Sequence, residues 1–292
     1  MTEGSRPVQA AIWMLGAIVS FSSMAVAGRA VAGVLDTFEL MMYRSFIGVA
    51  IILSIGSLTG RLREVRHSNL RLHLIRNLSH FAGQNLWFHA LSLITLAQLF
   101  SLEFTSPIWV MILAVLFLGE KLTVARLLAL CLGFAGALLV ARPGSGGDAV
   151  GLALAALAAI CFAGSIVTTK MLTRHETIIG ILFWLTVMQS VMGVVAAGWD
   201  GDIRWPPAHL WPWVALVGGA GLLAHTCLTN ALALAPATVV TPMDFMRLPA
   251  IAVVGLVFYA EPLNALTLAG AALIFAGNYL NIFMEARRSR PM

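Results

Sequence analysis

The sequence predicts an all-α integral membrane protein with ten transmembrane helices in two inverted five-helix repeats. Three observations predict this fold class: the composition, the length of the apolar segments and an internal repeat. Of 292 residues, 60% are hydrophobic and 11% are charged, and the mean hydropathy is +0.90. Apolar segments of about 20 residues fit a bilayer core of about 30 Å, whereas a soluble domain needs a more polar surface. The net charge of +5 does not indicate nucleic-acid binding, because the Lys and Arg residues fall in short loops between apolar segments.

Ten apolar segments follow one another along the chain. Strands of a membrane barrel would be about ten residues long with alternating polarity, so we expect these segments to be helices. The first segment imitates a cleavable signal peptide, but its Phe21-Ser22-Ser23-Met24 is matched by Phe162-Ala163-Gly164-Ser165 further on. A removed segment is not expected to belong to a repeat, so it is retained as the first helix. The predicted spans are 8–28, 38–58, 74–94, 97–118, 122–140, 149–172, 177–198, 210–233, 237–258 and 264–284.

The internal repeat has an offset of 141 residues. His89 to Phe104 recurs in weaker form as Asn230 to Phe245, and each copy carries one acid, Glu103 or Asp244. Because each unit holds an odd number of spans, the second copy enters the membrane from the opposite side, as in many secondary transporters. This architecture predicts alternating access. The predicted repeats are residues 1–143 and 144–292.

The positive charges predict the orientation. With ten spans and both ends in the cytoplasm, most of the 18 Lys and Arg residues, including the cluster from Arg61 to Arg76, lie on the cytoplasmic side. The opposite orientation would invert this bias. The external loop from Trp199 to Trp213 is typical of an interfacial aromatic belt rather than a ligand site.

The end of each repeat carries a common motif. Gly119-Glu120 precedes a helix with Gly133 to Gly136, and Ala260-Glu261 precedes one with Gly270-Ala271 and Phe275-Ala276-Gly277. With the ten spans, this pattern resembles the drug/metabolite transporter superfamily in its EamA-type branch. The resemblance implies the EamA fold, an exporter of the cell inner membrane with cytoplasmic termini, and a cavity built mainly from spans 1, 3, 4, 6, 8 and 9.

Within that branch the chain looks most like the YddG-type exporters, which implies export of amino acids, including aromatic ones. Nucleosides, sugars and cationic drugs remain alternative substrates. The expected partners are a small-molecule substrate and membrane lipid, and a monomer is sufficient, with a dimer as the alternative.

Two acids and two arginines inside predicted spans are candidates for function, because a charge there costs about 2.5–3.5 kcal/mol on insertion scales. Arg44 and Glu103 lie at equal depth from the outer side, and Asp244 and Arg247 are one helical turn apart near the cytoplasmic side. We hypothesise that Arg44 with Glu103, and Asp244 with Arg247, form gating charge pairs on opposite sides of a cavity. Purely structural pairs are the alternative.

A polar face on the third span predicts the substrate site. Asn77, His80 and Gln84 have helical spacing, and the repeat places His225 and Thr229 at matching positions of the eighth span. Such groups would converge near the midplane, as binding of α-amino and α-carboxyl groups requires. For each residue alone, helix packing is the alternative, and His80 and His225 could instead carry protons. The candidate aromatic contacts are Trp87, Phe100, Trp109, Phe162 and Trp184.

Three prolines lie in the two acid-bearing spans. Pro107, Pro242 and Pro249 each remove a helical hydrogen bond, so we expect kinks or hinges near the acids. A static kink without movement is the alternative.

Motifs for enzyme chemistry are absent from the sequence. It has no HExxH, GxSxG, GxxxxGK[ST] or Cys/His metal spacing, which predicts no enzyme activity, no cofactor and no metal site. An intramembrane enzyme using His80, Glu103 or His225, and a channel, remain the rival classes.

Overall fold

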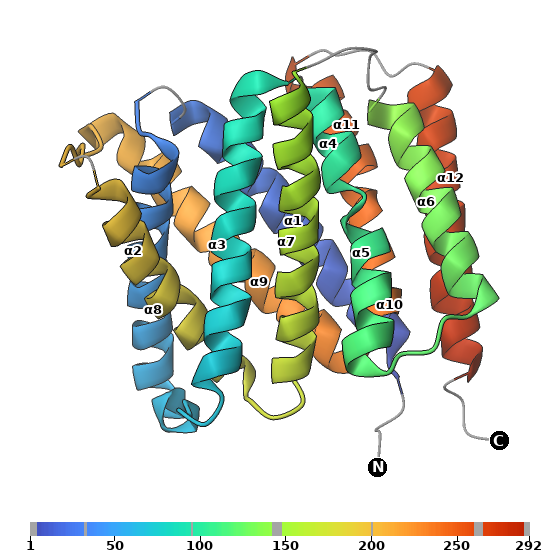
Figure 1. The fold of residues 1–292 in the computed structure, drawn as a ribbon, viewed down its shortest axis with the longest axis horizontal. Coiled ribbons are helices and arrows are strands. Elements are labelled where there is room, and N and C mark those ends of the chain that lie inside the picture. The colour runs from blue at the N-terminus through green and yellow to red at the C-terminus, as the bar shows by residue number, and fades with distance from the viewer. Residues whose placement is uncertain are drawn as a thin grey trace.

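A computed structural model describes residues 5–31, 34–94, 96–141, 148–199, 201–259 and 265–288. Within these residues every regular secondary structure element is a helix, and there is no β-strand (Figure 1). The predicted repeat boundary at residues 143 and 144 and the Ala260-Glu261 motif lie outside the described residues. The main helices are α1 (Pro7–Val31), α2 (Thr37–Leu58), α3 (Leu70–Leu93), α4 (Leu96–Glu103), α5 (Ser106–Leu113), α6 (Val124–Ala141), α7 (Ala149–Leu172), α8 (Ile178–Ala197), α9 (Trp211–Leu234), α10 (Ala237–Val240), α11 (Arg247–Tyr259) and α12 (Ala265–Arg288).

Short side chains fix the starts of three long helices. Asp36 caps α2 in a reciprocal capping box, in which its carboxylate accepts from the Glu39 backbone N–H at 2.8 Å and Glu39 accepts from the Asp36 N–H. Asp148 caps α7 and Thr177 caps α8, each through a side-chain oxygen that accepts from a backbone N–H of the first turn. These side chains satisfy backbone donors that have no partner within the helix.

Seven stretches of the described chain are long and apolar enough to cross a membrane, and Val124–Val140 is a shorter apolar helix. Of the other predicted spans, 74–94 falls on α3, which carries many polar side chains, and 237–258 falls on the divided α10–α11 segment. The count of ten spans therefore stays a prediction. The seven stretches are Pro7–Gly28, Thr37–Leu58, Gln98–Leu118, Ala149–Leu172, Ile178–Ala197, Ala208–Leu234 and Ala265–Arg288.

The two acid-bearing spans are not continuous α-helices. In the first, α4 ends at Glu103, α5 restarts at Ser106, and a π-helical turn, η2 (Ala114–Leu118), follows. In the second, a 3₁₀ segment, η4 (Thr241–Met246), separates α10 from α11. Pro107 and Pro242 lie in the first turns after these breaks, so the predicted departure from a straight helix is present in both spans.

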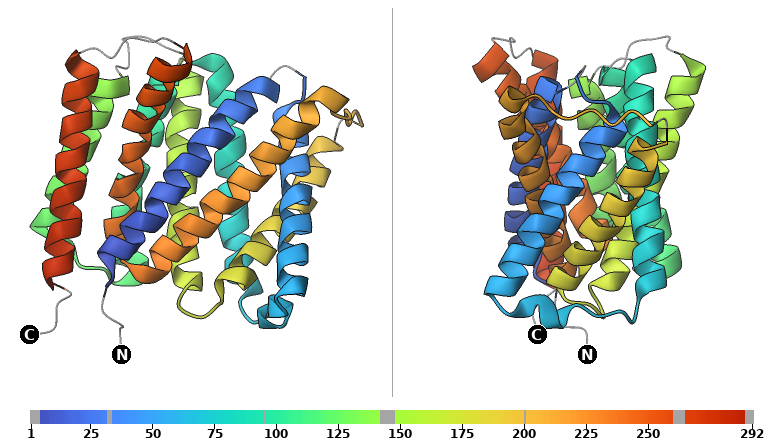
Figure 2. Two further views of the ribbon diagram at one scale, coloured as in Figure 1. Left: turned by 180° about the vertical axis from the view of Figure 1, so that it is seen from behind. Right: turned by 90° about the vertical axis from the view of Figure 1, so that its left-hand side faces the viewer.

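The helices pack as four main pairs: α1 with α9, α3 with α7, α2 with α8, and α6 with α12. Figure 2 shows α1 and α9 running side by side across the molecule. α6 and α12 approach closely at Gly136, which has no side chain. A Cβ at this position would lie 2.5 Å from the Gly270 carbonyl oxygen. Small residues of this kind allow helices in membranes to pack by direct backbone contact.

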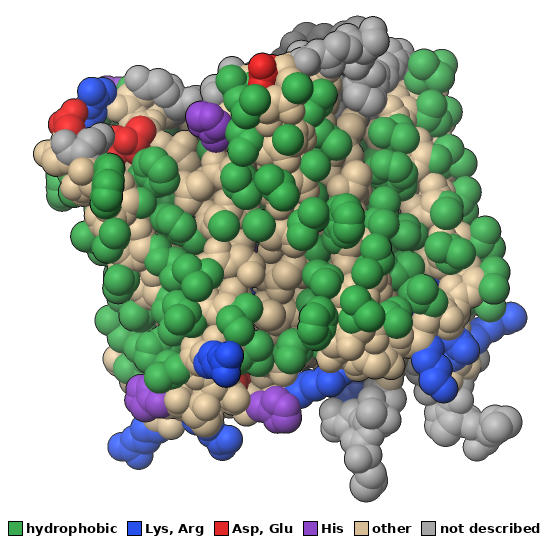
Figure 3. Space-filling model, in the orientation of Figure 1, with side chains coloured by type: hydrophobic (Ala, Val, Ile, Leu, Met, Phe, Trp, Pro, Cys, Tyr) green, Lys and Arg blue, Asp and Glu red, His purple; other side chains and the backbone are tan. Residues whose placement is uncertain are grey.

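Apolar side chains cover most of the face drawn in Figure 3. Large exposed apolar residues include Leu116, Val195 and Tyr279. On this face most Lys and Arg side chains gather along the edge at which α1 begins and α12 ends. This surface is that of a multi-pass membrane protein, with lipid-facing sides and charged ends.

Candidate functional site

A cavity of about 700 Å³ lies between the helices. It reaches Asp36 and Thr37 at the start of α2 and extends to Arg76 and Thr169 toward the other end of the molecule. Its walls come from both halves of the chain and are mostly apolar. Predicted site residues that line it are His80, Gln84, Trp87, Phe100, Phe162, His225, Thr229, Arg44, Glu103, Asp244, Arg247 and Pro107.

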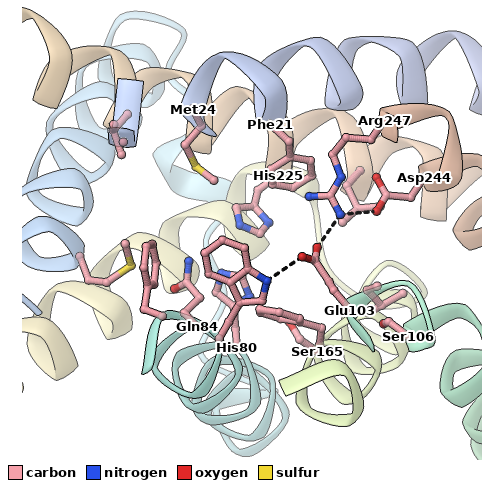
Figure 4. A pocket seen from close by; sticks show the side chains of 18 of the residues that line it. Phe21, Met24, His80, Gln84, Glu103, Ser106, Ser165, His225, Asp244 and Arg247 are labelled. Carbon is pink, nitrogen blue, oxygen red and sulfur yellow. Dashed lines mark hydrogen bonds and ion pairs between the residues drawn. The ribbon is translucent and has the colours of Figure 1, made fainter. Parts of the chain in front are cut away.

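A three-residue ionic cluster forms part of the cavity wall (Figure 4). Arg247 Nη2 lies 2.5 Å from Glu103 Oε1 and 3.0 Å from Asp244 Oδ2. Trp87 Nε1 donates to the second Glu103 oxygen at 2.7 Å. The Arg247 guanidinium also lies over the Phe104 ring, 5.2 Å from its centroid. One arginine thus joins α4, η4 and α11, on both sides of the repeat boundary.

The structure brings Asp244 and Arg247 together, whereas the predicted contact of Arg44 with Glu103 is wrong in this structure, and a gating role for these residues stays a prediction. Glu103 binds Arg247, whereas Arg44 donates to the Met41 sulfur at 3.5 Å and has no acidic side chain in ion-pair range among the described residues. The expectation that the two acids lie on opposite sides of the cavity is wrong for the same reason. Equal depth in the membrane does not determine the direction in which a side chain points around its helix.

The two cavity histidines contact each other. The rings of His80 on α3 and His225 on α9 lie 4.7 Å apart, edge to face, and Phe21 and Phe162 flank the pair (Figure 4). Both imidazoles are buried. The expected convergence of polar groups from α3 and α9 is therefore present in the geometry.

Several buried polar atoms at the cavity have no hydrogen-bond partner within the described protein. They include His80 Nε2, Gln84 Oε1, Ser106 Oγ and Asp244 Oδ1. Buried polar groups without a partner are unfavourable by about 1–3 kcal/mol each. These atoms lie beside the cavity and are sealed from contact in this structure.

Five predicted site residues do not line the cavity: Asn77, Trp109, Trp184, Pro242 and Pro249. Asn77 is fully buried toward α8, where Gln189 Nε2 donates to its backbone oxygen at 2.9 Å. Trp184 donates to the Arg66 carbonyl at 2.9 Å, and Trp109 is 36% exposed on the outer surface. The buried position of Asn77 suits helix packing, which was the alternative for each residue of this set alone.

Arg76 is a cavity residue that the sequence reasoning missed, because it was counted with the cytoplasmic arginine cluster. It is 2% exposed, and it donates to Thr169 Oγ1 at 3.2 Å and Asn77 Oδ1 at 2.9 Å. The missed signal was spacing, since Arg76, His80 and Gln84 follow one another at intervals of four residues.

Comparison with known proteins identifies the family. The model of the EamA-like transporter family matches residues 8–142 and again residues 149–283. The chain belongs to the EamA-like transporter family. It is therefore a membrane transporter of the drug/metabolite transporter superfamily, and its family and relatives are transporters rather than enzymes.

Curated relatives in this family carry different substrate names. A riboflavin transporter of Brucella anthropi is 33% identical, with 78% of this chain and 82% of the relative covered. An S-adenosylmethionine uptake transporter of Rickettsia bellii is 26% identical over 94% of both chains. The pseudopaline exporter CntI of Pseudomonas aeruginosa is 27% identical over 87% of this chain and 89% of its own. A solved crystal structure with 18% identity shares the fold, with a TM-score of 0.80 over 95% of this chain and 98% of that one.

In this EamA-like chain, charged side chains bind helix ends beyond the end of the cavity near Arg76. The contact of Glu120 crosses between the two halves, whereas that of Lys170 lies within the second half. Glu120 accepts from the backbone N–H groups of Ala237 and Thr238 at 2.8 and 3.1 Å, at the start of α10. Lys170 Nζ donates to the carbonyls of Leu232 and Ala235 at the end of α9. Gly119 has a φ of 66°, which ends η2 and allows the chain to turn into Glu120. The carboxylate and the ammonium thus complement the free N–H and C=O groups of helix ends.

Proposed function

We propose that this chain is a secondary carrier that binds a small organic metabolite in the central cavity and moves it by alternating access. The observation that carries the proposal is the cavity of about 700 Å³, with mostly apolar walls and a few converging polar groups. This size and lining are typical of sites for organic ligands. Because helices of both halves form the walls, a movement of one half against the other would change access to the site.

Two observations support an inverted arrangement of the halves. The family model matches twice, over 8–142 and 149–283. The repeat offset relates α1 to α7 and α3 to α9, so the packed pair α1–α9 corresponds to the packed pair α3–α7. α1 starts at the lower edge of Figure 1 and α7 at the upper edge, as an axis in the membrane plane requires.

The gathering of Lys and Arg at the edge where α1 begins supports an inner-membrane protein with cytoplasmic termini. In that orientation the cavity reaches toward the outside through Asp36 and Thr37, and Glu120 and Lys170 close the cytoplasmic side. The structure then represents an outward-facing state of the proposed carrier.

The proposed cargo is an amino acid or a similar metabolite with a ring. Trp87, Phe100 and Phe162 supply aromatic surface, and both carboxylates and guanidinium groups face the cavity. Riboflavin and S-adenosylmethionine, named for the relatives, also combine a ring system with polar groups. We propose export as the direction, following the resemblance of the chain to amino-acid exporters.

Counterflow into proteoliposomes containing the purified chain tests the carrier. The panel consists of phenylalanine, tryptophan, riboflavin, S-adenosylmethionine, a nucleoside, a sugar and a cationic drug, each preloaded and then presented outside in labelled form. We expect saturable uptake of a labelled compound only when the same or a competing compound is preloaded. A flux that rises linearly with concentration would indicate a channel, chemical conversion would indicate an enzyme, and no uptake of any member would contradict the proposal.

A further inference from the structure

Two arginines that line the cavity have no acidic partner among the described residues. Arg44 on α2 is 9% exposed, and its one hydrogen bond is to the Met41 sulfur. Arg76 on α3 is 2% exposed, and it bonds to the neutral side chains of Thr169 and Asn77. The other charged groups at the cavity are already engaged, since Glu103 and Asp244 bind Arg247 and Asp36 caps α2.

Burying an arginine without a counter-charge has a free-energy cost when no ligand is bound. An ionised side chain at membrane depth costs about 2.5–3.5 kcal/mol on insertion scales, and buried charges are normally paired. Elsewhere in this chain the buried Arg126 follows that rule, because it lies 3.0 Å from Glu285. Arg44 and Arg76 carry like charges and line the same cavity. Without a counter-charge among the described residues, they are suited to one supplied by a ligand.

The remaining donors of these arginines are accessible from the cavity. A guanidinium has five N–H donors, and the hydrogen bonds described above use one on Arg44 and two on Arg76. None of their unbonded nitrogens is among the side-chain atoms sealed from contact without a partner. Gly221 makes room beside Arg44, since a Cβ there would lie 3.6 Å from its Nε and Nη2.

The surroundings suit a ligand group that accepts hydrogen bonds. His80 lies one turn after Arg76 on α3, and it touches His225, which is on the same helix as Gly221. Guanidinium groups bind carboxylates and phosphates through paired N–H donors, which neutral amides and hydroxyls match less well.

We propose that Arg44 and Arg76 form a subsite for an anionic group, a carboxylate or a phosphate, of the transported molecule. The proposal rests on the proposed carrier function, because it assigns part of the same cavity. The subsite lies on the α2–α3 wall, whereas the Glu103–Arg247–Asp244 cluster, with one carboxylate in excess, lies on the wall formed by α4 and η4. A zwitterion would therefore find a group of opposite charge on each wall.

Matched ligand pairs test the subsite in the purified full chain. Phenylalanine is compared with phenylalaninamide, and riboflavin 5′-phosphate with riboflavin, through the shift of the thermal unfolding midpoint with ligand concentration. Acetate and inorganic phosphate at fixed ionic strength serve as minimal anions. We expect the anionic member of at least one pair to bind about tenfold or more tightly, as a charge-assisted hydrogen bond provides. Arg44→Gln and Arg76→Gln should each reduce this ratio about tenfold, and Arg44→Lys should retain part of it.

Arg61→Gln is the matched control, because Arg61 is an exposed arginine bonded to Glu64 outside the cavity. It should keep the wild-type preference for anions. Without ligand, Arg44→Gln should unfold at the wild-type temperature or above, which shows that the variant folds. A ratio near one in wild type, an unchanged ratio in both glutamine variants, or no stabilisation by any anionic probe would overturn the subsite.

The two proposals fail in different ways. Saturable counterflow of both phenylalaninamide and riboflavin that is as fast as that of their anionic partners would leave the carrier intact and exclude the subsite. Anion-dependent stabilisation without saturable counterflow of any compound would retain the subsite and exclude the carrier.

Discussion

Arg247 is the shared cationic partner of two carboxylates in the cavity wall. It binds Glu103 from α4 and Asp244 from η4, and Trp87 of α3 donates to the same Glu103 carboxylate. Each carboxylate alone would be a buried charge of high free energy, and the shared guanidinium offsets both. The cluster therefore couples the broken parts of two spans through one side chain.

Removing the shared cation should destabilise the fold more than removing one acid. We expect Arg247→Gln to lower the free energy of unfolding by about 3–5 kcal/mol, because two buried carboxylates lose their partner. Glu103→Gln should lower it by about 1–3 kcal/mol, since Asp244 still binds Arg247. Thermal unfolding of the purified variants measures the order, with Arg247→Lys as the control that keeps the charge. Equal losses in the two variants would contradict the shared role of Arg247.

At the residue scale, most of the site residues predicted from the sequence line the cavity, but some of their partners were misassigned. His80, Gln84 and His225 could be predicted, because a polar side chain in an apolar span is unfavourable toward lipid and is expected to face the interior of the bundle. The repeat also showed that the two helices correspond. The partner of Glu103 could not be predicted, since helical spacing gives depth and relative angle but not the rotation of each helix in the bundle. Asn77 shows the same limit, because it shares helical spacing with His80 yet packs against Gln189 of α8.

At the scale of secondary structure elements, proline explains why both acid-bearing spans are broken. Pro107 cannot donate to the carbonyl of Glu103, four residues earlier, and α4 ends at that residue. Pro242 lies at the start of the 3₁₀ segment η4 that carries Asp244. The sequence predicted these kinks from proline alone, but the 3₁₀ and π-helical turns depend on packing and could not be predicted. Irregular backbone at membrane depth is tolerated where it lines a cavity, as both breaks do here.

The contact of α6 with α12 leads to a stability prediction. A Cβ at position 136 would lie 2.5 Å from the Gly270 oxygen, and a Cβ at 270 would lie 2.6 Å from the Gly136 oxygen, so neither backbone can yield without separating the helices. We expect Gly136→Ala to lower the free energy of unfolding by about 1–3 kcal/mol. Gly219→Ala on α9 is the matched control, because a Cβ there meets no atom within 4 Å. The control should be neutral or more stable, by up to about 1 kcal/mol. A similar unfolding midpoint for both variants would contradict the close contact.

At the scale of the whole molecule, the repeat could be predicted because an offset of 141 residues preserves which helices correspond. It predicted two matching halves, and the family model matches each half. The exchange of partners could not be predicted, namely that α1 packs on α9 of the other half and α3 on α7. That arrangement follows from burial of facing surfaces, which a single sequence does not reveal. Its consequence is that each main helix pair spans both halves, so the halves cannot separate, and in the proposed carrier access would change through tilting within the bundle.

The contacts of Glu120 and Lys170 predict which side of the bundle is closed. Glu120 binds the start of α10 in the other half, Lys170 binds the end of α9 within its own half, and Arg174 adds a bond across the halves to the Leu118 carbonyl at 3.1 Å. Charge-assisted bonds of this kind contribute about 1.5–3 kcal/mol each. Loss of the Glu120 carboxylate should therefore favour opening of this side.

The measurement uses a Ser165→Cys probe in the cavity, in a background with the three native cysteines replaced by alanine. A membrane-impermeant maleimide is applied to inside-out vesicles, from the side on which α1 begins. We expect Glu120→Gln to raise the labelling rate about tenfold or more, and Lys170→Met to act in the same direction. Arg61→Gln, on the same side but away from these contacts, should leave the rate unchanged. Labelling that stays at the slow rate in both variants would mean that other contacts close this side, and faster labelling with Arg61→Gln would point to a general effect of charge at this surface.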